Sequence, residues 1–86
     1  MKIEVNPVRK TVFQSWDDEC EKRRLFIHEL HIALYSFFPT ITDIRYERHS
    51  TNEWLIIEYA DGGEIRELIN DYSLQRTMAK ITEHLR

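Results

Sequence analysis

The chain has few of the residues that mark special classes of protein. Its 86 residues include two glycines, two prolines and one cysteine, and its 12 basic and 15 acidic side chains give a net charge of -3. So little glycine and proline excludes a collagen-like or low-complexity chain, and a single cysteine excludes an internal disulfide. The charge balance also lacks the basic surplus of a typical nucleic-acid-binding domain and the dense acidic face of a DNA mimic.

Long hydrophobic runs are absent as well. The longest uncharged stretch, residues 32–42, is interrupted by Ser36, Pro39 and Thr40, so we expect no membrane partner. The first thirty residues show no basic-then-apolar signal pattern. Together with the single cysteine, these features predict a cytoplasmic protein.

The length and the apolar pattern predict one domain, residues 1–86, of the α+β class. We expect an N-terminal edge strand or arm over 1–14, a long helix over 15–38, an antiparallel meander over 41–69 and a C-terminal helix over 71–86. The expected order is therefore β-α-β-β-β-α. It gives a small sheet of three to four antiparallel strands with both helices packed on one face.

The long helix has the clearest pattern. Ser15-Trp16-Asp17-Asp18 has the form of a capping box, and Pro39 limits the helix at its other end. The apolar residues step by three, four and seven and predict a buried stripe, which consists of Trp16, Cys20, Ile27, Leu30, Leu34 and Phe37.

Turn residues predict how the second half of the chain is connected. Asp61-Gly62-Gly63 indicates a hairpin, and a three-residue loop with Gly63 in the left-handed region opposes Glu58 with Arg66 as an ion pair. The closing helix has three candidate N-caps, Asn70, Asp71 and Ser73. Its predicted buried stripe consists of Leu74, Met78, Ile81 and Leu85.

No motif in the sequence predicts catalysis. Gly62-Gly63 lacks the spacing of a phosphate-binding loop, and Cys20 lies on the apolar stripe, where a small core residue is expected. His28 and His31 share one helix without further ligands at suitable spacing. We therefore expect a protein that is not an enzyme, with no cofactor, no metal and no small-molecule substrate.

The candidate interaction site lies on the side of the long helix opposite its apolar stripe. Leu25, His28, Ile32 and Tyr35 gather there with charged residues around them, where a solvated face is normally polar. This pattern predicts a contact with a protein partner or with a second copy of the chain, as in a regulatory or accessory module. Two alternatives are ordinary isolated exposed residues and coverage of this face by the N-terminal segment.

Nucleic acid is the alternative partner, through Arg45 and Arg66 on the exposed side of the sheet, with Trp54 or His49 beside them. The helix, three strands, helix order resembles the topology of the double-stranded-RNA-binding domain. The chain has no Gly-Pro-x-His loop, however, and its closing helix begins without that family's Lys-Lys-x-Ala-Lys start. The nearby carboxylates favour a lattice of ion pairs instead, formed with Glu47, Glu53, Glu58 and Glu67.

Overall fold

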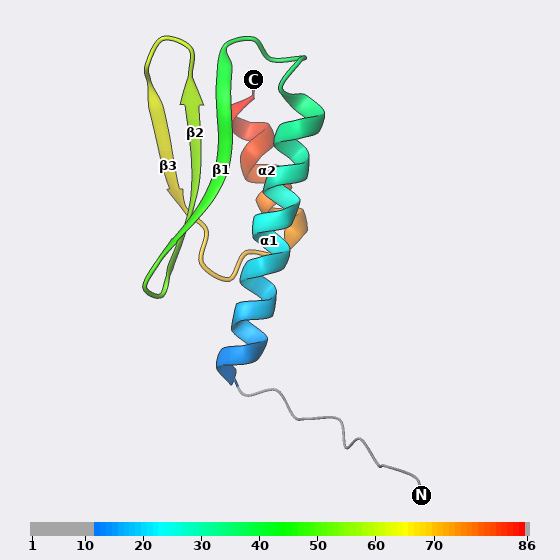
Figure 1. Ribbon diagram of the computed structural model, residues 1–86, viewed down its shortest axis with the longest axis vertical. Coiled ribbons are helices and arrows are strands. Elements are labelled where there is room, and N and C mark those ends of the chain that lie inside the picture. Colours follow the sequence, from blue (N-terminus) through cyan, green and yellow to red (C-terminus); the bar gives the residue numbers. More distant parts are fainter. Residues whose placement is uncertain (1–11, 86) are drawn as a thin grey trace, which may run out of the picture.

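Helices flank the sheet in sequence. The structure, a computed structural model, describes residues 12–85, and within them the chain forms α1 (Val12–Leu34), β1 (Ile41–His49), β2 (Asn52–Tyr59), β3 (Glu64–Leu68) and α2 (Leu74–His84) (Figure 1). The strands are antiparallel and lie in the order β1-β2-β3. This arrangement confirms the predicted α+β fold.

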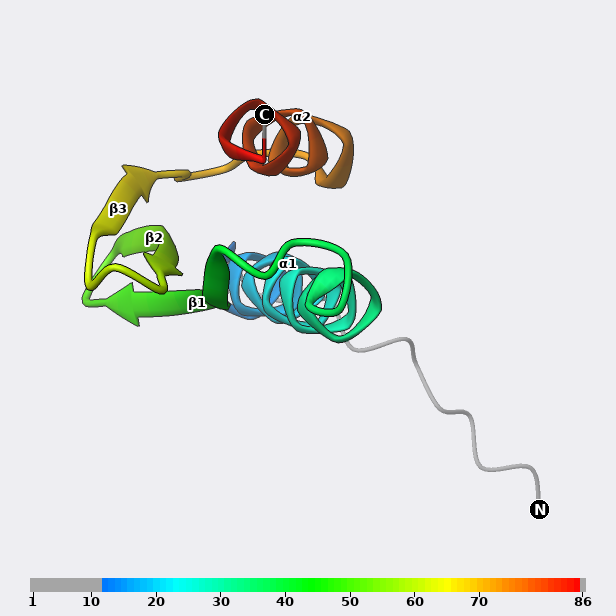
Figure 2. The ribbon, with the colours of Figure 1, turned by 90° about the horizontal axis from the view of Figure 1, so that it is seen from above.

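Both helices lie on the same side of the curved sheet, as expected (Figure 2). Side chains on β2 alternate between its two faces. Glu53, Leu55 and Ile57 are fully buried beneath the helices, and Ile27 of α1 and Ile81 of α2 pack against this inner face. The remaining members of the buried core cluster are Ile41, Ile44 and Ile69.

The bounds of α1 differ from the predicted 15–38 at both ends. The helix begins at Val12, so Ser15 lies inside it and residues 12–14 are helical, while the rest of the predicted edge strand or arm lies outside the described residues. No residue between Val12 and Ser15 breaks a helix, so the helix extends past the expected cap. At the other end the amide of Phe37 donates to the Leu34 carbonyl in a tight turn, and Phe37 is 73% exposed instead of buried.

The predicted register of the second hairpin is wrong by two residues. The loop has three residues, as expected, but it consists of Ala60, Asp61 and Gly62, and Gly62 holds the positive φ of 91°. Glu58 therefore faces Glu64 and not Arg66. The repulsion between these two carboxylates is offset by Arg45 of β1, which forms ion pairs with both.

At the start of α2, Ser73 is the N-cap, and its hydroxyl accepts a hydrogen bond from the Arg76 amide at 3.1 Å. The buried side of the helix differs from the predicted stripe, because Leu74 and Met78 are 40% and 39% exposed while Thr77 is fully buried. The Thr77 hydroxyl donates to the Ser73 carbonyl within the same turn. Its polar atom is thus satisfied locally, so the side chain can be buried.

Candidate functional site

The four predicted interaction residues lie together on the exposed side of α1. We call Leu25, His28, Ile32 and Tyr35 the α1 back face. Leu25, Ile32 and Tyr35 are 45%, 57% and 62% exposed, and His28 is exposed as well. Cys20 and Ile27, on the opposite side of the same helix, are buried against the sheet. One helix therefore has two apolar sides, and only one of them is covered by the described residues.

The charges beside the α1 back face are partly neutralised within the chain. Arg24 donates from Nε to Glu21 at 2.9 Å and forms a second, shorter contact with the same carboxylate, which lowers the pKa of Glu21. In contrast, His28 and Glu29 form no hydrogen bond or ion pair with any side chain in the described part of the chain. These adjacent titratable groups are available for contacts with another molecule.

A shallow groove of about 290 Å³ lies between α1 and β1, next to the α1 back face. His28 and Ile32 line it from the helix, and Asp43 and Tyr46 line it from the strand. Nδ1 of His31 lies 3.0 Å from the Ile44 amide nitrogen and 3.0 Å from Asp43 Oδ1. The neutral ring accepts the Ile44 N–H, and the protonated ring pairs with Asp43. Because His31 uses this edge of β1, α1 shields the edge from pairing with another strand.

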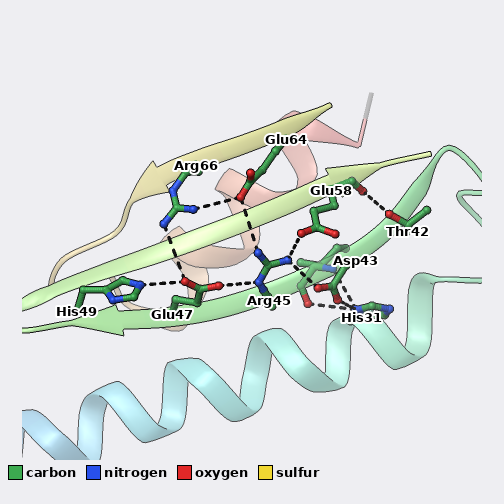
Figure 3. A network of polar contacts seen from close by, with 10 residues as sticks. His31, Thr42, Asp43, Arg45, Glu47, His49, Glu58, Glu64 and Arg66 are labelled. Atoms are coloured by element: carbon green, nitrogen blue, oxygen red, sulfur yellow. Dashed lines mark hydrogen bonds and ion pairs between the residues drawn. The ribbon is translucent and has the colours of Figure 1, made fainter. Parts of the chain in front are cut away.

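The alternative site, Arg45 and Arg66, lies on the outer face of the sheet (Figure 3). Arg45 forms ion pairs with carboxylates at 2.7 Å, 2.9 Å and 2.5 Å, which belong to Glu47, Asp43 and Glu58. These hydrogen bonds, led by the one to Glu47, raise the pKa of Arg45 further above its usual range. Arg66 pairs with Glu64 at 3.2 Å. The outer face carries a lattice of ion pairs with four carboxylates around two guanidinium groups, but of the four carboxylates predicted for it only Glu47 and Glu58 take part. The described residues of this face therefore offer no surplus of positive charge for phosphate.

Two of the carboxylates expected in this lattice belong elsewhere. Glu53 and Glu67 lie on the inner side of the sheet, where Glu67 accepts a contact from His84 of α2 at 3.1 Å. Their side chains follow the alternation of β2 and β3, which places odd-numbered residues toward the helices. Asp43 and Glu64 complete the lattice instead, since both pair with Arg45 on the outer face.

An ion pair that the sequence analysis missed lies between α1 and β2. Arg23 Nε donates to Glu53 Oε1 at 2.7 Å and Nη2 donates to Oε2 at 2.8 Å, and the two side chains are 3% and 0% exposed. The Tyr46 hydroxyl and the Asp71 amide also donate to the Glu53 carboxylate, at 2.8 Å and 3.3 Å. Arg23 in turn donates from Nη1 to the Tyr72 carbonyl. The pair therefore connects α1, β1, β2 and the segment before α2.

Burial and hydrogen bonding oppose one another at Glu53. Burial alone raises the pKa of this carboxyl, but the hydrogen bonds from Arg23, Cys20 and Tyr46 outweigh it, and the pKa lies below its usual value. Burial also raises the pKa of the Tyr46 hydroxyl, and its contacts with Cys20 and Glu53 add to this effect. At neutral pH the network therefore holds an ionised carboxylate and a neutral phenol.

One signal in the sequence indicates this pair. The apolar stripe of α1 steps by seven from Cys20 to Ile27, and Arg23 occupies the position in between, three residues after one and four before the other. An arginine inside a buried stripe requires a buried acidic partner. The identity of that partner depends on the tertiary fold, since Glu53 follows 30 residues later.

The remaining candidate chemistry in the sequence concerns metal ligands and the single thiol. No group of three or more His, Cys, Asp or Glu side chains in residues 12–85 could hold a metal ion. Cys20 is buried at 2% exposure, which confirms its expected place in the core. None of the helices in this part of the chain is long and apolar enough to cross a membrane.

Comparison with known proteins adds one similarity. No family model matches the chain, and no solved structure matches it. The chain is 32% identical over 68 residues to a probable serine/threonine-protein kinase, mkcE, of Dictyostelium discoideum. The match covers 76% of this chain and 10% of that protein. Because the chain spans only a tenth of this curated relative, the similarity shows neither a family nor an activity.

Proposed function

We propose that this chain is a small non-enzymatic interaction module, of a regulatory or accessory kind, whose contact surface is the α1 back face. The observation that carries the proposal is the exposure of Leu25, Ile32 and Tyr35, between 45% and 62%, on a helix whose opposite side already packs on the sheet. Burying such a side chain fully contributes about 1.5–3 kcal/mol. Covering this face therefore gives a protein partner a substantial gain in free energy.

The charge distribution supports a protein partner over nucleic acid. The arginines of the outer face, Arg45 and Arg66, already pair with carboxylates, and Arg24 pairs with Glu21 beside the α1 back face. A nucleic-acid backbone must compete with these carboxylates for each of these three guanidinium groups. We place the module in the cytoplasm because its single cysteine, Cys20, has no cysteine with which to form an internal disulfide.

The test replaces two apolar residues of the α1 back face with charge. A Leu25→Glu, Ile32→Glu variant is expected to lose capture of protein partners from native lysate, or to show a lower mass in light scattering, while its circular dichroism is unchanged. The matched control is Leu74→Glu, Met78→Glu, which makes the same change at residues of α2 that are 40% and 39% exposed. The control is expected to behave like the original protein.

Two results contradict the proposal. One is an unchanged mass together with unchanged capture in the α1 variant. The other is an equal loss in both variants, which means that added charge anywhere on the surface is responsible and not the α1 back face. Nuclease treatment of the lysate separates capture through a protein from capture through nucleic acid.

A further inference from the structure

We propose that the occupant of the α1 back face is a second copy of this chain, whose α1 runs antiparallel to the first about a two-fold axis between His28 and Glu29. This inference rests on the proposed function, since it names the partner of the same surface. It follows from the self-complementarity of the face. In a two-fold contact each residue meets a different residue of the other copy, and every contact occurs twice.

The seven-residue step from Leu25 to Ile32 sets the register. Leu25, His28, Ile32 and Tyr35 are separated by three, four and three residues, the spacing at which two helices pack along a shared seam. An axis between His28 and Glu29 places Leu25 of one copy against Ile32 of the other. Both side chains are about half exposed in the single chain, and each covers the other in the pair.

The same register brings the unpaired charges together. His28 of one copy meets Glu29 of the other, and neither group has an ion pair with a described residue of its own chain. The imidazole N–H donates to the carboxylate, and protonation of the ring makes the contact an ion pair. Lys22 of one copy lies opposite Tyr35 of the other, which suits a cation against an aromatic ring.

A parallel pair is disfavoured by the same residues. It places Glu29 against Glu29 and His28 against His28, so the two carboxylates face each other without a counter-charge. The dipoles of two parallel helices also repel, whereas those of antiparallel helices attract. The Glu21–Arg24 pair beside the seam is neutral within each chain, so it opposes neither approach.

The experiment is a charge exchange across the two-fold axis, measured by analytical ultracentrifugation of the full chain. His28→Glu places two carboxylates together twice, and we expect the dissociation constant of the dimer to rise by about tenfold. Adding Glu29→Lys to the same chain restores an opposite-charge pair at both contacts. The double variant is therefore expected to recover the original dissociation constant or a lower one.

The outcomes separate this inference from the proposed function. If the dissociation constant of the His28→Glu, Glu29→Lys variant stays as high as that of His28→Glu, the antiparallel register is wrong. If the original chain is a monomer while Leu25→Glu, Ile32→Glu still loses capture of a partner, the second copy is overturned and the interaction surface stands. Circular dichroism checks that each variant is folded, which is expected because residues 28 and 29 are exposed.

Discussion

Arginine–carboxylate clusters lie on both faces of the sheet, and they differ in their exposure to water. On the inner face Arg23 and Glu53 are 3% and 0% exposed and form a bidentate pair. On the outer face Arg45, 32% exposed, shares its guanidinium among several carboxylates. The buried pair has one geometry with every polar atom satisfied, whereas the outer cluster has several interchangeable partners.

This difference determines what each cluster contributes. A buried charge without its partner loses its hydration and gains nothing in return, so each member of the inner pair is required by the other. An exposed charge recovers hydration when a partner is removed. In residues 12–85 no buried side-chain nitrogen or oxygen lacks a hydrogen-bond partner. The inner pair therefore specifies how α1 docks on β2. On the outer face Ile56 lies between Arg45 and Arg66 in the strand pairing and is fully buried, so the lattice also covers this side chain.

The largest expected effect comes from breaking the buried pair. Glu53→Gln leaves the Arg23 guanidinium buried without a counter-charge, and we expect the free energy of unfolding to fall by about 3–5 kcal/mol. Urea denaturation followed by circular dichroism measures this loss. The matched control is Glu58→Gln, the same substitution on the outer face of the same strand, with an expected loss below about 1 kcal/mol. Equal losses at the two positions contradict the contrast between the faces.

Acid is expected to weaken the buried pair progressively. The folded-state pKa of Glu53 lies below its usual value, so its ionised form stabilises the fold fully above the unfolded-state pKa, about 4.3, and this contribution is lost as pH falls through the folded-state value. The stability gap between the original protein and Glu53→Gln is expected to be constant from pH 7 to about pH 5 and to narrow below about pH 4. If the stability difference between the two proteins grows as the pH falls, the pKa of Glu53 is raised in the folded state and not lowered.

The smallest expected effect is at the outer face. Arg45→Met keeps a side chain over Ile56 but removes the cation between Glu58 and Glu64, and we expect a loss of about 0–1 kcal/mol. The loss is expected to shrink in about 1 M salt, because the facing carboxylates are exposed and their repulsion is screened. Arg23→Met serves as the comparison, since its larger loss is expected to be insensitive to salt.

Much of the fold could be predicted from the sequence because local patterns determine it. The strands of the meander, the three-residue loop and the start of α2 near Ser73, one of three candidate caps, are each set by a few neighbouring residues. The hairpin register was missed because Glu58 opposite Glu64 is an unfavourable pair until Arg45, from a third strand, forms ion pairs with both. The buried side of α2 was missed because Thr77 satisfies its hydroxyl within the helix.

The sequence predicts where the candidate site lies on α1, but it does not identify what binds there. The helical spacing placed Leu25, His28, Ile32 and Tyr35 on one side of α1, and the structure places them on its exposed side. Their binding partner stays a prediction. Arg23 and Glu53 were missed as a pair because the sequence analysis assigned Glu53 to the outer face, and only the alternation of β2 in the folded sheet brings it under α1.

The position of the single thiol makes the buried network observable. Sγ of Cys20 lies 3.7 Å from Nη2 of Arg23 and the residue is 2% exposed, so a thiol reagent reacts with it rapidly only when the packing between α1 and the sheet opens. The rate of labelling therefore reports how often the helix and sheet separate in otherwise native solution. Because Cys20 is the single cysteine in the 86 residues, thiol labelling can measure local opening of the original protein without an engineered cysteine.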